Sequence, residues 1–198
     1  MVMKPTSTIK NENAVDGRAK NYLTAGEIET FLKAARKGRH GVRNFAMVLL
    51  AYRHGLRVSE LVDTRLSDAD LDTGRLFVRR CKGSLSTSQP MDGSEIRAVR
   101  AWLRERFNAP CCNSPLLFLS ERGPMTRQAM NYTVAEIGRR AGLPIKVHPH
   151  MLRHSCGYTL ANKGRDTRLI QDYLGHRNIR HTETYTRTAA IRFDGLWN

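Results

Sequence analysis

Apolar residues begin to recur at helical spacing just after Thr24. Thr24 and Glu27 stand three apart, the spacing of a capping box, in which each side chain bonds the backbone of the other residue. The apolar positions that follow predict an amphipathic helix, with Ile28, Phe31, Leu32 and Ala35 inward. A second helix should end near Gly55, because glycine favours helix termination. Its apolar face consists of Phe45, Val48, Leu49 and Tyr52.

After the second helix, apolar and polar residues alternate along the chain. Leu76 and Val78 lie on one side of a predicted strand, Arg75–Arg80. Lys82-Gly83-Ser84 predicts a turn, and residues 85–91 are predicted to return as the next strand. This region is therefore expected to be a small antiparallel hairpin.

The second half of the chain is again mainly helical in pattern. Asp92 and Glu95 have capping-box spacing ahead of one helix, and Thr126 opens another that should end at Gly142. Between these two helices, the apolar run Leu116–Leu119 predicts one more short strand.

Three further helical segments close the chain. They are predicted at 149–163, at 166–174 and around Tyr185, and the middle one should bury Leu169, Ile170 and Leu174. The whole pattern predicts an α+β fold that is mainly α with a small antiparallel β-sheet. It forms one domain over residues 22–198, preceded by a flexible basic tail, residues 1–21, that has no hydrophobic period.

The charge of the chain indicates a protein that binds polyanions. The sequence has 33 Lys and Arg against 18 Asp and Glu, a net charge of +15. Nucleic acid is the expected partner, because Lys and Arg release counterions from its phosphates. A membrane surface would require a basic amphipathic helix or a lipid signal, and the sequence shows neither. Its cysteines have no CxxC spacing, so free thiols and a cytoplasmic location are expected.

Three polar clusters are candidates for chemistry. Arg57 follows the helix-ending Gly55 and stands three residues before Glu60, although an ordinary surface ion pair has the same pattern. In the second cluster, His150 and Arg153 share one helix face. A zinc site is the alternative there, through His148, His150 and His154, but a fixed guanidinium beside the metal disfavours it.

The third cluster is Leu174-Gly175-His176, nine residues before Tyr185. A tyrosine is most often a packing residue whose hydroxyl bonds a neighbour. The sequence around Tyr185 is polar, which favours a chemical role over simple core packing.

Taken together, these motifs resemble the tyrosine recombinase (phage integrase) family. The resemblance rests on Arg57 in GLRVSE, His150 and Arg153 in HPHMLRHS, His176 after LG, and Tyr185, in that order. HPHMLRHSCGYTLANKG and DTRLIQDYLGHRNIRHT are similar to the short bacterial recombinases that invert a fimbrial promoter switch. The resemblance covers residues 22–197 and implies the tyrosine recombinase catalytic-domain fold without a separate N-terminal domain.

The resemblance also implies a role for each matching residue. The expected catalytic residues are Arg57, Lys82, His150, Arg153, His176 and Tyr185, with Glu60 in support. Tyr185 would attack a DNA phosphate held by the two arginines and form a 3′-phosphotyrosine. Lys82, at the hairpin turn, would protonate the leaving 5′-oxygen. Neither a metal nor another cofactor is expected, because two guanidiniums can stabilise the charge that develops on the phosphate.

The implied partners are double-stranded DNA with inverted-repeat recombination sites, three further subunits in a homotetramer, and DNA-bending accessory proteins, all at the bacterial nucleoid. Residues 186–198 either pass to a neighbouring subunit or fold back on their own core. Two other functions stay open: a DNA-binding regulator without catalysis, and a topoisomerase that nicks and reseals DNA. A regulator has no need for Tyr185, His176, His150 and Lys82 together.

Overall fold

Capping side chains fix where several helices begin. The computed structural model describes residues 20–80, 83–194 and 197. Thr24 and Glu27 form the expected capping box ahead of helix α1 (Ala25–Ala35), and Asp92 and Glu95 form another ahead of α4 (Gly93–Arg106). Thr126 caps α5 (Arg127–Arg140) by accepting the backbone N–H of Ala129 at 3.1 Å. These predicted helix starts are confirmed.

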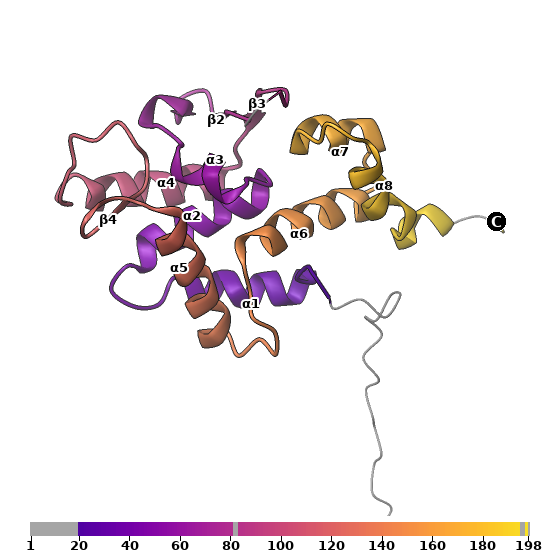
Figure 1. The fold of residues 1–198 in the computed structure, drawn as a ribbon, viewed down its shortest axis with the longest axis horizontal. Helices are drawn as coiled ribbons and strands as arrows, with labels where there is room; N and C mark the ends of the chain where they lie inside the picture. Colours follow the sequence, from indigo (N-terminus) through magenta and orange to yellow (C-terminus); the bar gives the residue numbers. More distant parts are fainter. Residues whose placement is uncertain (1–19, 81–82, 195–196, 198) are drawn as a thin grey trace, which may run out of the picture.

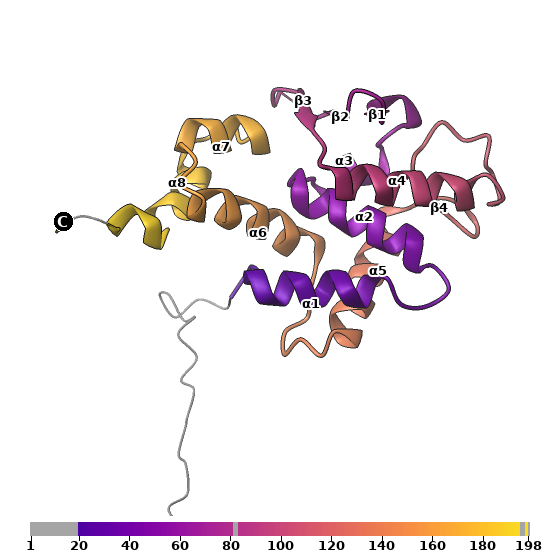
Figure 2. The ribbon, with the colours of Figure 1, turned by 180° about the vertical axis from the view of Figure 1, so that it is seen from behind.

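Helix α2 (Gly41–Arg53) is the centre of the main core, packed against α1, α4 and α6 (Pro149–Asn162). Its residues from Ala46 to Ala51 are all buried. Figure 1 shows α1 to α5 and the strands forming one larger group, from which α6 leads to α7 (Thr167–Leu174) and α8 (Arg180–Arg187). Figure 2 shows the same arrangement from behind. The short helix α3 (Val58–Val62) packs on α2 and α5.

Three short strands form the main sheet, in the order β1 (Ala69–Asp70), β2 (Arg75–Val78) and β3 (Thr87–Pro90), all antiparallel. Leu76 and Val78 are buried, whereas Phe77 between them is 41% exposed. The predicted hairpin is therefore confirmed, although both strands are shorter than expected. The mainly helical fold with small antiparallel sheets is confirmed as well.

The prediction of a strand at Leu116–Leu119 was only partly right. Strand β4 is Leu119–Ser120 and pairs with β5 (Gly123–Pro124), while Leu116 forms a single bridge with Arg65. The Arg106 guanidinium donates hydrogen bonds to several backbone carbonyls of this segment, those of Cys112, Ser114, Leu116 and Leu117. These side-chain bonds, and not a continuous β ladder, hold most of the carbonyls of this segment.

Helices α6, α7 and α8 enclose a second, smaller core. Its buried residues are Cys156, Ala161, Ile170, Leu174, Tyr185 and Ala189. The expected burial of Leu169 was wrong, since its side chain is 55% exposed. Ile170 and Leu174 stand four apart and form the buried stripe of α7, and Leu169 is rotated about 100° away from that stripe. Tyr185 is only 3% exposed, so its polar sequence neighbours do not keep its ring in solvent.

The two ends of the described chain differ in how closely they pack. The Tyr22 ring packs against the Tyr158 ring at a tilt of 35°, with centroids 4.1 Å apart, and Lys20 pairs with Glu27 at 2.6 Å. After α8, Phe193 and Trp197 are 58% and 97% exposed. Most of the predicted basic tail, residues 1–19, lies outside the described residues. No helix in the described part of the chain is long and apolar enough to cross a bilayer.

Candidate active site

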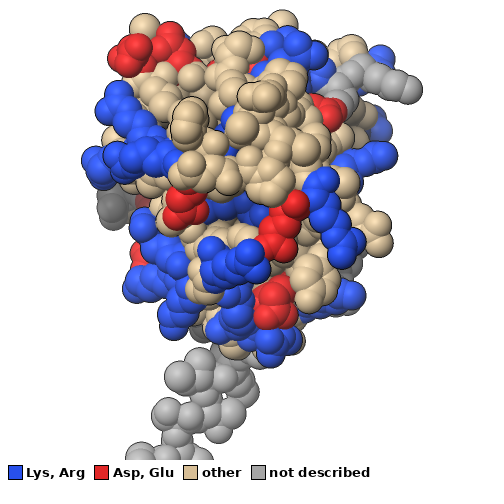
Figure 3. Space-filling view, turned by 90° about the vertical axis from the view of Figure 1, so that its left-hand side faces the viewer, with Lys and Arg blue, Asp and Glu red and all other residues tan. Residues whose placement is uncertain are grey.

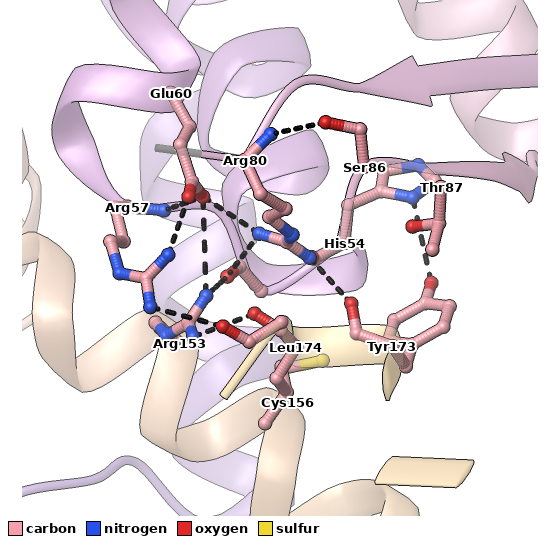
Figure 4. Close-up of polar contacts among 12 residues, drawn as sticks. His54, Arg57, Glu60, Arg80, Ser86, Thr87, Arg153, Cys156, Tyr173 and Leu174 are labelled. Atoms are coloured by element: carbon pink, nitrogen blue, oxygen red, sulfur yellow. Dashed lines mark hydrogen bonds and ion pairs between the residues drawn. The ribbon is translucent and has the colours of Figure 1, made fainter. Parts of the chain in front are cut away.

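A buried carboxylate, Glu60, joins two arginines at the start of α3. Its Oε2 accepts the backbone N–H of Arg57 at 2.9 Å, and its Oε1 accepts Arg57 Nη1 at 2.6 Å. Oε2 also accepts Arg80 Nη1 at 2.7 Å (Figure 4). Burial favours the neutral acid, but the charge of Arg80 and the hydrogen bonds from Arg57 outweigh it, so the pKa of Glu60 is lowered. Glu60 is thus ionised at neutral pH and fixes both guanidiniums.

Arg153, on α6, places a third guanidinium beside Glu60. Its Nη1 donates to the backbone carbonyl of Gly55, and its Nη2 donates to that of Leu174 at 2.7 Å. Nη1 lies 4.0 Å from Glu60 Oε2. Burial, followed by the charges of the two neighbouring arginines, lowers the pKa of Arg153 to about 10. The side chain is still charged at neutral pH and is held by the ends of two helices.

Arg80 belongs to this cluster but is in none of the sequence motifs. Its side chain is fully buried. Its Nη2 donates to the carbonyl of His54 at 3.0 Å and to that of Tyr173. A signal for its position exists in the sequence, because residue 80 is in phase with the inward-facing Leu76 and Val78. An arginine in a buried phase requires acceptors, and here a carboxylate and helix-end carbonyls supply them.

Tyr185 lies on α8 with its hydroxyl against α6. The phenol oxygen is 2.8 Å from Nδ1 of His154. The ring lies on Gly157, where a Cβ would come within 2.5 Å of the ring atom Cε2. Burial raises the pKa of Tyr185 to about 12, against the opposing effect of Arg153. With that pKa, forming the phenolate at pH 7 costs about 7 kcal/mol.

His176 lies between the arginine cluster and Tyr185. It follows Gly175, which ends α7 in the left-handed conformation at φ 66°. His176 Nδ1 is 2.9 Å from the hydroxyl of Thr182, and its ring centroid is 6.1 Å from that of Tyr185. Burial, followed by the charge of Arg153, lowers the pKa of His176 to about 3. His176 is therefore a neutral imidazole beside fixed positive charge.

The two remaining predicted catalytic residues are not part of this cluster in the described structure. His150 is exposed on the first turn of α6, with its ring centroid 6.4 Å from that of His148. Lys82 lies outside the described residues. The sequence indicated His154 only as a ligand of the alternative zinc site, but in the structure His154 contacts the Tyr185 hydroxyl. Across the described ranges, no three His, Cys, Asp or Glu side chains gather closely enough to hold a metal ion.

Residues 21–192 of this chain match the phage integrase family. The chain belongs to this family. The type 1 fimbriae regulatory protein FimB of Escherichia coli K12 is 47% identical over 188 residues, which are 94% of each chain. This relative confirms the resemblance to the short fimbrial recombinases that the motifs indicated.

Two solved structures share the fold. The crystal structure of XerA recombinase has a TM-score of 0.77 and 30% identity, over 86% of this chain and 62% of that chain. The structure of XerH site-specific recombinase bound to difH substrate has a TM-score of 0.73 and 26% identity, over 84% of this chain and 50% of that chain. The chain therefore spans between half and two thirds of these two recombinases.

The charge of this phage integrase family member is distributed in two ways. At the site, the guanidiniums of Arg57, Arg80 and Arg153 surround one carboxylate, which leaves two positive charges. Figure 3 shows Lys and Arg over much of the lower part and the sides of one face, with a few Asp and Glu among them. A separate hollow of about 650 Å³ has basic lining residues that include Lys37, Arg39, Arg122 and Arg140. At the site, by contrast, the guanidiniums of Arg80 and Arg153 are buried and hydrogen-bonded.

Proposed function

We propose that this protein is a site-specific DNA recombinase that cleaves and rejoins DNA through a 3′-phosphotyrosine and inverts a promoter element that controls fimbriae. The observation that carries this proposal is the convergence of Arg57, Arg153 and His176, from separate parts of the chain, beside Tyr185. The similarity to FimB over 94% of each chain supports the fimbrial role.

The arginine cluster is suited to a phosphodiester that gains charge as it reacts. The phosphate carries one negative charge before attack and approaches two in the transition state. Three guanidiniums and the Glu60 carboxylate leave two positive charges, which balance the transition state better than the ground state. Arg57 is half-buried and Arg153 is aimed by two helix-end carbonyls, so these two guanidiniums contact the phosphate. Arg80 adds charge and holds Glu60 from behind.

In the reaction we propose, the Tyr185 oxygen forms a bond to phosphorus and the bond to the 5′-oxygen breaks. Lys82 gives a proton to that leaving oxygen, and His150 and His176 donate hydrogen bonds to the phosphate. The product keeps an ester between tyrosine and the 3′-phosphate, so a 5′-hydroxyl can attack it and reseal the strand without ATP. No residue in this scheme requires a metal or another cofactor.

The partners we propose follow from this chemistry. Double-stranded DNA with inverted repeats is the substrate, consistent with the DNA-bound recombinase XerH. A homotetramer would exchange strands between two such sites, and DNA-bending proteins would bring the sites together at the nucleoid in the cytoplasm. The exposed Phe193 and Trp197 are available for contacts between subunits. Residues 22–198 are proposed to be the catalytic domain.

A covalent-trapping experiment tests the proposed function. The Tyr185→Phe variant first selects bound duplexes from a random pool, and these are resynthesised with a nick that lets the short 5′-hydroxyl strand diffuse away. The wild-type protein should then form an adduct that survives denaturant, and Tyr185→Phe should form none. Tyr132→Phe is the matched control, since Tyr132 is 73% exposed and should leave the adduct unchanged. Absence of an adduct with the wild-type protein would favour the non-catalytic regulator.

Two further measurements refine the result. Recombination between two selected sites on one plasmid identifies a recombinase, whereas relaxation of supercoils alone identifies a topoisomerase. Arg153→Ala should lower the rate of adduct formation about tenfold to a hundredfold, because a hydrogen bond to a charged group is worth about 1.5–3 kcal/mol. Equal loss of DNA binding would show that Arg153 serves only to anchor the backbone.

A further inference from the structure

The hydroxyl of Tyr185 has one hydrogen-bond partner among the described residues, and it is His154. The phenol oxygen and His154 Nδ1 are 2.8 Å apart, and the two rings meet edge-on with centroids 5.9 Å apart. His154 lies one turn before Gly157 and Tyr158, which hold the face and the edge of the Tyr185 ring. The contact is thus fixed from both sides, by the rigid helix α6 and by the packing of the ring.

The chemistry of the two groups decides the direction of this hydrogen bond. A phenol is a stronger acid than the N–H of a neutral imidazole, and an imidazole nitrogen is a better acceptor than a phenol oxygen. The favoured arrangement therefore has the Tyr185 hydroxyl donating to Nδ1, with the His154 proton on Nε2. This arrangement requires a neutral histidine.

The surroundings of His154 keep it neutral. Its pKa is lowered to about 4, first by burial and then by nearby positive or protonatable groups. The titratable and charged groups that face it from its own helix and from the neighbouring segments are His148, His150, Arg153, His176 and Tyr185. Within the described residues no carboxylate faces it, so above about pH 5 its Nδ1 is an unprotonated acceptor aimed at the nucleophile.

We propose that His154 is a catalytic residue that accepts the Tyr185 proton during attack on DNA. This role rests on the proposed recombinase function and adds to it a residue outside the predicted catalytic set. The step is balanced: the oxygen–phosphorus bond forms, the phenolic proton moves to Nδ1, and His154 becomes an imidazolium. The bond from phosphorus to the 5′-oxygen breaks, and that oxygen takes its proton from Lys82. In resealing, the imidazolium returns its proton to the departing phenol.

The contact also explains how a buried phenol can react. Tyr185 loses its proton to solvent with difficulty, because its pKa is raised to about 12. A neutral acceptor already in contact with the hydroxyl removes the need to form a free phenolate first. In this step the positive charge that His154 gains lies close to the phosphate, where it stabilises the negative charge that develops on the non-bridging oxygens.

The test uses single-turnover adduct formation on the nicked duplex, with protein in excess. His154→Gln keeps a polar side chain but cannot take up a proton near neutral pH. We expect its rate at pH 7 to fall about 100-fold or more, the range typical of a lost general base. Between pH 7 and 9 the ratio of its rate to the wild-type rate should rise about tenfold per pH unit, because hydroxide then removes the phenolic proton. A residue that only packs against the ring would give a ratio independent of pH.

A second substrate separates this role from that of the leaving-group acid. When sulfur replaces the bridging 5′-oxygen, the leaving thiolate needs no proton. On this duplex Lys82→Ala should recover most of the wild-type rate, whereas His154→Gln should remain slow. Recovery of His154→Gln on the sulfur substrate would overturn the proposal.

Controls separate chemistry from folding. His40→Gln is the matched control, because His40 is also a partly exposed histidine but pairs with Glu121 away from the site. DNA binding and the melting temperature of His154→Gln should stay close to the wild-type values, and His154→Asn should repeat its pH-dependent rate ratio. Wild-type adduct together with a His154→Gln rate within threefold of wild type would overturn the role alone. Absence of wild-type adduct would overturn the recombinase function and this role with it.

Discussion

The fully buried Arg80 predicts a large, specific loss of stability on substitution. Arg80→Met removes the guanidinium but keeps a side chain of similar length. Glu60 then loses the 2.7 Å bond from Nη1, and the carbonyls of His54 and Tyr173 lose their bonds from Nη2. Removing one member of a buried charged pair costs about 3–5 kcal/mol. Glu60 keeps its bonds from Arg57, which places the expected loss at the lower end of that range.

Urea unfolding followed by tryptophan fluorescence measures this loss, since Trp102 is 5% exposed and reports on the main core. Arg75→Met is the control, because Arg75 is exposed on β2, the strand that leads to Arg80, and should change little. Combining Arg80→Met with Glu60→Gln should cost at least about 1 kcal/mol less than the sum of the single changes, because the two side chains interact directly. A loss below about 1 kcal/mol for Arg80→Met, or strict additivity of the two changes, would show that this pair does not hold the site together.

Two further predictions concern the residues around the nucleophile. The lowered pKa values of His154 and His176, about 4 and about 3, mean that below the ordinary value of 6.5 the unfolded chain binds more protons than the folded chain. The free energy of unfolding should therefore fall by about 1.4 kcal/mol per pH unit for each of these two histidines as the pH drops from 6 to about 4. Urea unfolding at several pH values should show this, and His176→Gln should remove about 1.4 kcal/mol per pH unit from the slope. Gly157→Ala places a Cβ 2.5 Å from the Tyr185 ring and should both destabilise the protein and abolish most adduct formation, whereas Gly26→Ala, with nothing within 4 Å of the added Cβ, should do neither.

Local sequence signals were sufficient for much of the fold. The capping pairs at Thr24 and Asp92 act over three residues, so they can be identified without knowledge of the tertiary structure. The alternation in Arg75–Val78 likewise predicts which strand face is buried. The segment around Leu116 was misjudged because its backbone carbonyls bond the Arg106 side chain, a contact that strand propensity does not report.

The candidate site was predicted through its motifs, not through its geometry. Arg57, Arg153 and His176 do come together, as the motifs implied. The motifs did not show that Tyr185 is buried or that its hydroxyl meets His154, since this contact spans 31 positions and depends on how α8 packs on α6. The alternation through Arg80 carried a usable signal, because a charged residue in a buried phase requires a buried partner.

Peptide mapping of the trapped adduct identifies the residue that becomes linked to DNA. Trypsin releases the segment from His181 to Arg187, in which Tyr185 is the sole tyrosine. After nuclease and trypsin digestion of the wild-type adduct, mass spectrometry should find this peptide carrying a 3′-linked nucleotide phosphate on Tyr185. A nucleotide on a different residue, or one linked through its 5′ phosphate, would show that Tyr185 does not form a 3′-phosphotyrosine.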